Sequence, residues 1–78
     1  MTELERKVLA ILAAEDAPRS VPVLQFRHRE LKAYKPRQLF HAMTELHALG
    51  LITRAETRPE REMRYRITSD GHQRLILS

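Results

Sequence analysis

Four side chains that can exchange hydrogen bonds with nucleic-acid bases lie close together in the chain: Arg37, Gln38, His41 and Thr44. Arginine and glutamine can each make paired hydrogen bonds to a base edge in the major groove of DNA. If this segment is helical, at about 100° per residue, Arg37, His41, Thr44 and Ala48 share one face. Small or hydrogen-bonding side chains on one face suit close approach to bases. An ordinary solvent-exposed helix face can have a similar composition.

The segment around these residues has clear helix start and stop signals. Pro36 fits the first helical position, where its missing N–H would have no partner, and Gly50 can end the helix in a left-handed conformation. The side chains opposite the polar face are apolar: Leu39, Ala42, Met43 and Leu46. We therefore predict a helix over residues 36–49 with one face in the core and the other facing a partner. Arg37, Gln38, His41 and Thr44 are the predicted base contacts.

Basic residues are concentrated just before and at the start of this helix. Residues 27–37 carry a local charge of +4, equal to the formal net charge of the whole chain, because Glu30 is their only acid. Cations beside a helix N-terminus can bind a phosphate. A solvated charge run is the alternative. The predicted backbone contacts in this segment are Arg27, Arg29, Lys32 and Lys35.

The N-terminal half predicts two further helices. Thr2 and Glu5 match a capping box, and apolar residues then recur at helical spacing to about residue 15. The next segment is ambiguous, because residues 21–26 could be a short edge strand followed by a helix over residues 27–33. We favour a helix from the start of this segment, since four residues keep helical spacing: Val21, Leu24, His28 and Leu31.

After Gly50 the pattern alternates, which predicts two strands and an arginine-rich β-hairpin, or wing, over residues 53–66. Arginine suits phosphate contacts and narrow minor grooves, so we expect Arg58 and Arg61 at the tip, and Arg64, to contact the DNA backbone or minor groove. Cross-strand ion pairs are the alternative for the arginines within the strands. Thr68 can cap a last short helix, residues 69–77, whose Leu75 returns to the core.

Composition limits the other functional classes. Seventy-eight residues make one domain, the sequence has no cysteine, and no apolar run is long enough to span a membrane. The acidic N-terminus does not resemble a signal peptide, so a cytoplasmic protein, nucleoid-associated when bound to DNA, is expected. The pI of about 10.1 favours an anionic partner such as nucleic acid.

Catalysis and metal binding have little support in the sequence. Ser69, Asp70 and His72 are adjacent, but residues of a triad meet through the fold, and a TSDG segment before a helix is ordinary capping chemistry. The four histidines include no i, i+4 pair and have no cysteine partner. We therefore expect no enzyme activity, no metal site and no cofactor.

Three helices, a two-stranded hairpin and a closing helix predict an α+β fold, the winged helix-turn-helix. Residues 36–52, PRQLFHAMTELHALGLI, resemble the recognition helix of PadR-like transcriptional regulators, and residues 65–75, YRITSDGHQRL, resemble the wing ending that PadR-like and MarR-like proteins share. The resemblance covers residues 35–75 well and residues 1–34 in outline. It implies a sequence-specific regulator of double-stranded DNA, expected to be a repressor that occupies a promoter, reduced to the DNA-binding domain.

Members of that family normally carry a long C-terminal dimerisation helix, which residues 1–78 are not expected to provide. A smaller homodimer contact is expected instead from the apolar end of the chain, Leu75, Ile76 and Leu77, because a short helix cannot bury three consecutive residues. The alternative function is a winged-helix adaptor, or a small phage or accessory protein, that binds a host protein. A fold alone does not decide between these functions.

Overall fold

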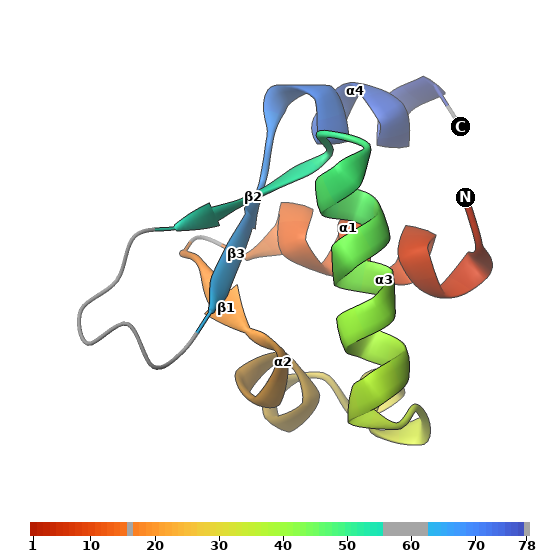
Figure 1. Cartoon of the computed structure of the whole chain (residues 1–78), viewed down its shortest axis with the longest axis vertical. Helices are drawn as coiled ribbons and strands as arrows, with labels where there is room; N and C mark the ends of the chain where they lie inside the picture. Colours follow the sequence, from red (N-terminus) through yellow and green to blue (C-terminus); the bar gives the residue numbers. More distant parts are fainter. Residues whose placement is uncertain (16, 56–62, 78) are drawn as a thin grey trace.

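Four α-helices, one 3₁₀ helix and a small antiparallel sheet make up the described part of the chain (Figure 1). The structure is a computed structural model, described here for residues 1–15, 17–55 and 63–77. The elements in chain order are α1 (Glu3–Ala14), β1 (Arg19–Ser20), α2 (Val21–Arg27), η1, the 3₁₀ helix (Arg29–Ala33), α3 (Pro36–Ala48), β2 (Ile52–Ala55), β3 (Arg64–Ile67) and α4 (Ser69–Leu77). The predicted α+β class is confirmed.

The start of α3 is fixed by Pro36 and by a glutamine cap. Pro36 is the first residue of the helix, as predicted, and its ring lies where no intrahelical N–H is needed. The backbone N–H of Lys35 donates to Gln38 Oε1 at 2.8 Å. This bond satisfies a backbone donor that the helix itself cannot pair.

The end of α3 is a glycine-terminated turn. Gly50 has a φ of +76°, the left-handed region that a side chain disfavours. The N–H of Gly50 donates to the carbonyl oxygen of His47 and that of Leu51 to Leu46, both at 3.0 Å. These two bonds form the Schellman arrangement, which turns the chain back so that Leu51 is buried.

The second helical segment differs from its prediction beyond residue 27. Residues 21–27 form α2, so the helix that we favoured for residues 21–26 is confirmed and the edge strand is wrong. The helix does not continue to Leu31, because His28 adopts an extended conformation, with φ −121° and ψ 107°. Leu31 instead enters the core from η1, where it is fully buried.

The sheet has three strands, so the predicted two-stranded arrangement is wrong. The strand order is β1-β3-β2, and both pairings are antiparallel. The predicted pairing of β2 with β3 is present, with Ile52 opposite Ile67. β1 adds two residues, Arg19 opposite Tyr65 and Ser20 opposite Arg64, which is too short a strand to produce an alternating pattern.

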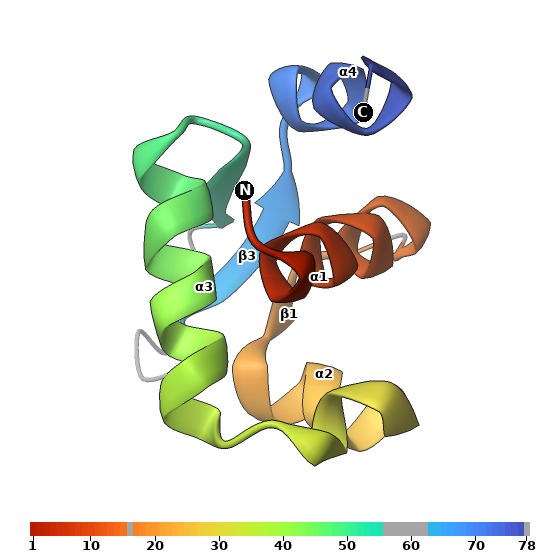
Figure 2. The same cartoon turned by 90° about the vertical axis from the view of Figure 1, so that its right-hand side faces the viewer.

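The core lies between α1, α3, the sheet and the α2–η1 segment (Figure 2). Both predicted amphipathic helices contribute their apolar faces to it. α4 and α2 lie at opposite ends of the molecule in both views. The buried hydrophobic residues are Val8, Leu9, Ile11, Leu12, Val21, Leu24, Leu31, Leu39, Ala42, Met43, Leu46, Leu51, Ile52 and Tyr65. No helix in the described residues is long and apolar enough to cross a membrane.

Thr68 joins the end of α3 to the start of α4. Its Oγ1 donates to the carbonyl oxygen of Gly50 at 2.8 Å and accepts the N–H of Gly71 at 3.1 Å. Gly71 is buried, and a Cβ atom there would overlap the carbonyl oxygen of Leu51 and the side chain of Ile67. The first turn of α4 can therefore approach the sheet this closely only with glycine at position 71.

Gly71→Ala is expected to lower the free energy of unfolding by about 2 kcal/mol, because the added methyl group must displace backbone as well as a side chain. Urea denaturation followed by circular dichroism measures this loss. Gln73→Ala, on the exposed side of the same helix, is the matched control and should stay within about 0.5 kcal/mol of the wild type. Equal stability of the two variants would show that α4 tolerates a shift away from Leu51.

Candidate nucleic-acid interface

The outward face of α3 has the composition that the sequence predicted. Arg37, His41, Thr44 and Ala48 are all exposed, whereas the opposite face is buried in the core. The Thr44 hydroxyl donates to the carbonyl oxygen of Phe40 at 2.9 Å, so it remains an acceptor for an outside group. This face therefore offers both hydrogen-bond donors and acceptors to a partner.

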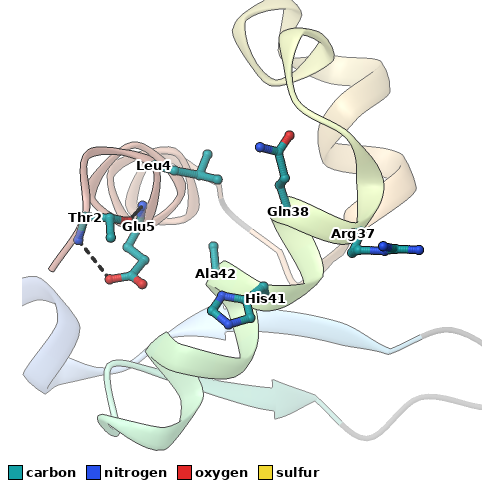
Figure 3. Close-up of a pocket in the computed structure, with 7 residues that line it drawn as sticks. All are labelled: Thr2, Leu4, Glu5, Arg37, Gln38, His41 and Ala42. Atoms are coloured by element: carbon teal, nitrogen blue, oxygen red, sulfur yellow. Dashed lines mark hydrogen bonds between the residues drawn. The ribbon is translucent and has the colours of Figure 1, made fainter.

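Gln38 lies toward α1 and away from the middle of this face. Its Oε1 is bound by the N–H of Lys35, which leaves its amide N–H groups as the available donors. In Figure 3, Gln38 extends on the side of Leu4, whereas Arg37 points away from α1. Sequence reasoning predicted Gln38 as a base contact but did not detect its capping role.

A shallow groove of about 390 Å³ separates α3 from the N-terminal end of α1 (Figure 3). On the α1 side, Leu4 gives the groove an apolar wall. On the α3 side, the groove is lined by Arg37, Gln38 and His41. Thr2 and Glu5 at its edge bond each other in the predicted capping box, at 3.0 and 3.1 Å. The groove borders the outward face of α3, so a partner that contacts Arg37 and His41 would also pass over it.

Exposed cations lie next to the start of α3. Arg29 and Lys32 lie on η1, and Lys35 directly precedes α3. None of the three forms an ion pair with another described residue. Glu30 is exposed in the same segment and reduces its charge. Arg29, Lys32 and Lys35 are therefore exposed on η1 and immediately before α3, and their contact with a phosphate stays a prediction.

Arg27 has a different environment from the other predicted phosphate contacts. Its Nε donates to Glu15 Oε1 at 3.1 Å, and its side chain is 48% exposed. Arg19 Nε donates to Glu15 Oε2 at 3.0 Å, and His28 Nε2 lies 2.7 Å from Oε1. The Glu15 carboxylate thus contacts three basic side chains from the segment after α1. Because Arg27 is already paired with this carboxylate, we do not include it among the proposed DNA contacts.

The Glu15 carboxylate is strongly stabilised in its charged form. Its side chain is only 5% exposed, which by itself would favour the neutral acid. The hydrogen bond with His28, the largest influence, and those from Arg19 and Arg27 outweigh this burial and lower the pKa of Glu15 from 4.5 to about 2. Glu15 therefore ties the end of α1 to β1 and α2 as an anion.

Sequence reasoning did not detect this cluster. Its members are separated from Glu15 by 4 to 13 positions, and none of the spacings is a recognised motif except the i, i+4 pair of Glu15 and Arg19. That pair was the one available signal, but it spans the end of α1 and so could not be assigned to one helix face.

The wing arginines are described only in part. Arg64 and Arg66 on β3 are exposed, as expected for the strand that returns from the tip. Arg58 and Arg61, the predicted tip contacts, lie outside the described residues. Their assignment to DNA therefore stays a prediction from the sequence.

The residues predicted to form a dimer contact divide into two kinds. Leu75 packs partly against the core, whereas Ile76 and Leu77 are 80% and 84% exposed.

The Ser69, Asp70 and His72 group lies in the first turns of α4 and is exposed, and the neighbouring Thr68 makes the predicted cap. Among the described residues, no group of three potential ligands could hold a metal ion.

Comparisons of the chain with protein-family models, with curated proteins and with solved structures found no match.

Because the pKa of Glu15 is lowered in the folded state, its stabilising effect is complete above pH 4.5 and is lost as the pH falls toward 2. Glu15→Gln should therefore lower the free energy of unfolding at pH 6 by on the order of 2 kcal/mol and have a smaller effect at pH 2.5. Urea denaturation at both pH values gives the difference.

Glu45→Gln, which removes an exposed carboxylate from α3, is the matched control for that experiment. It should leave the pH dependence close to that of the wild type. A Glu15→Gln effect of the same size at both pH values would mean that the side chain stabilises the fold through packing and hydrogen bonding alone, and not through its charge.

Proposed function

We propose that the protein is a winged helix-turn-helix transcriptional regulator that binds double-stranded DNA in the cytoplasm and represses by occupying a promoter. In this proposal α3 enters the major groove, and residues 53–66, which include most of β2 and β3, act as the wing. The observation that carries the proposal is the exposed face of Arg37, His41 and Thr44 on α3, together with the exposed cations of η1, which is separated from α3 by residues 34–35 only. Base-reading side chains next to phosphate-binding cations are the two parts that a DNA contact needs.

The distribution of charge supports this orientation on DNA. Lys35 and Arg37 lie at the N-terminal end of α3, where the helix dipole also favours an anion, and Arg29 and Lys32 lie on the preceding η1. The exposed Glu3 lies on α1, and the buried Glu15 carboxylate is occupied by its own cations. The end of α3 next to η1 is therefore the surface to which a polyanion would be drawn.

The order of elements also fits the proposal. α2 and η1 precede α3 and pack at its N-terminal end, which leaves the outward face of α3 uncovered (Figures 1 and 2). The paired strands β2 and β3 follow α3 directly, as the wing does in a winged helix-turn-helix. The third strand, β1, pairs with β3 on the side away from β2 and so does not cover α3.

A protein-interaction adaptor is the second candidate, and one observation favours it. Phe26 on α2 is 82% exposed, and Phe40 at the edge of the outward face of α3 is 44% exposed. Exposed aromatic side chains are enriched in protein interfaces. Salt dependence separates the two functions, because neutralising phosphates gives DNA affinity a steep fall with added salt.

Arg37→Ala tests the proposed function and its base contact together. DNA sequences are first selected from a random pool by the wild-type protein, and affinities for selected and scrambled duplexes are then measured by fluorescence anisotropy at several salt concentrations. The wild type should bind with a steep negative salt slope. Arg37→Ala should reduce discrimination between the two duplexes by about tenfold, since a bidentate base contact contributes about 1–3 kcal/mol.

Lys32→Ala is the matched control, and it should weaken binding to both duplexes equally. If Arg37→Ala also weakened both equally, Arg37 would be a phosphate contact and the base assignment would be wrong. Absence of any binding by the wild type at low salt would refute the DNA-binding proposal.

We also propose that the regulator is a homodimer, because one recognition helix buries little DNA surface and two half-sites give useful specificity. The exposed Ile76 and Leu77 on α4 are the proposed contact, and α4 lies at the opposite end of the molecule from α2 and η1 (Figure 1). A contact there leaves the DNA-binding face open. Leu75, packed partly on its own core, supports this end of α4 from within.

Replacing Ile76 and Leu77 together with serine should convert a dimer into a monomer in sedimentation velocity at micromolar concentration. This change keeps Leu75 and hence the packing of α4. Leu49→Ser, at a residue 52% exposed at the end of α3, is the matched control and should remain dimeric. A monomeric wild type, or a double variant that stays dimeric, would refute this interface.

A further inference from the structure

The basic segment before α3 is held by a side chain that does not itself face the proposed DNA. Gln25, on α2, is partly buried, and its Nε2 donates to two carbonyl oxygens, that of Tyr34 at 3.0 Å and that of Leu31 at 3.4 Å. Leu31 lies within η1, and Tyr34 caps its C-terminal end. One amide group therefore spans the turn that joins η1 to α3.

Lys32 on η1 and Lys35 in this turn are two of the proposed phosphate contacts. On the η1 side, the turn is anchored to the core by the fully buried Leu31. On the other side, Gln38 of α3 accepts the N–H of Lys35. Gln25 supplies the only side-chain hydrogen bonds from α2 to this turn among the described residues. Without it, the carbonyl oxygen of Tyr34 would lose this partner, and the spacing of the two lysines would be held only by the remaining contacts of Leu31, Tyr34 and Gln38.

We propose that Gln25 is a positioning residue for DNA binding, which fixes Lys32 and Lys35 at the spacing that lets both contact phosphates at the N-terminal end of α3. This inference rests on the proposed DNA-binding function. At this spacing both lysines reach phosphates in the same complex, whereas a displaced lysine would lose its phosphate contact, which lowers both the affinity and the number of phosphates neutralised. Base preference, which depends on the outward face of α3, should not depend on Gln25.

Gln25→Met keeps the length of the side chain and removes both hydrogen bonds. We expect it to weaken binding to selected and scrambled duplexes by the same factor, about threefold to tenfold at low salt. The slope of log affinity against log salt should become shallower by about one to two units, as for the loss of up to two phosphate contacts. A substitution that only destabilised the fold would lower the active fraction equally at every salt concentration and leave the slope unchanged.

Gln73→Met, on the exposed side of α4, is the matched control and should keep the wild-type affinity and slope. A second comparison uses the Lys32→Ala/Lys35→Ala double variant. If Gln25 acts through these lysines, adding Gln25→Met to that variant should change the slope no further. Circular dichroism establishes that each variant is folded before binding is measured.

The outcomes separate this inference from the function on which it rests. A wild-type protein that binds no DNA refutes both. A wild type with a steep salt slope, together with an unchanged slope in Gln25→Met, refutes only the role of Gln25. An additive effect of Gln25→Met in the double-lysine variant would also refute it, because Gln25 would then act elsewhere.

Discussion

The burial of one face of α3 is the constraint on which the rest of the structure depends. Leu39, Met43 and Leu46 are almost completely buried, in one core with apolar residues of α1, α2, η1, β2 and β3, against which Leu75 of α4 packs. Burying such side chains contributes roughly 1.5–3 kcal/mol each, which is large for a domain of this size. The same amphipathic pattern leaves the opposite face of α3 in water. The surface that we propose for DNA is thus a direct consequence of how the core is formed.

The parts of the fold that the sequence predicted are those whose signals are local. Pro36 and Gly50 mark the ends of α3, and Thr2 with Glu5 caps α1, because each signal depends on backbone groups within a few residues. The exposed face of α3 follows from the same periodicity. For these elements, helical spacing and end signals agree, and the prediction needs no tertiary information.

The parts that could not be predicted depend on contacts between distant segments. β1 has two residues and exists because β3 offers an edge to pair with, so its own sequence carries no strand pattern. His28 interrupts helical spacing because it turns toward Glu15, thirteen positions earlier. The sequence predicts Arg27 as a phosphate contact because a charge count within residues 27–37 does not include the partner of its side chain. That partner is Glu15, at the end of α1.

The Glu15 cluster changes how the positive charge of this protein should be interpreted. A formal charge of +4 suggests a generally basic surface, yet Arg19 and Arg27 are held by a buried carboxylate on the side of α1. The single negative charge of Glu15 offsets one of these two guanidinium charges, so the cluster attracts a polyanion less strongly than two unpaired arginines would. The charge that remains effective on η1 and α3 comes from Arg29, Lys32, Lys35 and Arg37. Glu15 therefore lowers the positive charge on the side of α1 relative to that on η1 and at the start of α3. In the proposed function, this difference would draw a DNA duplex toward the end of α3 at which Arg37 lies.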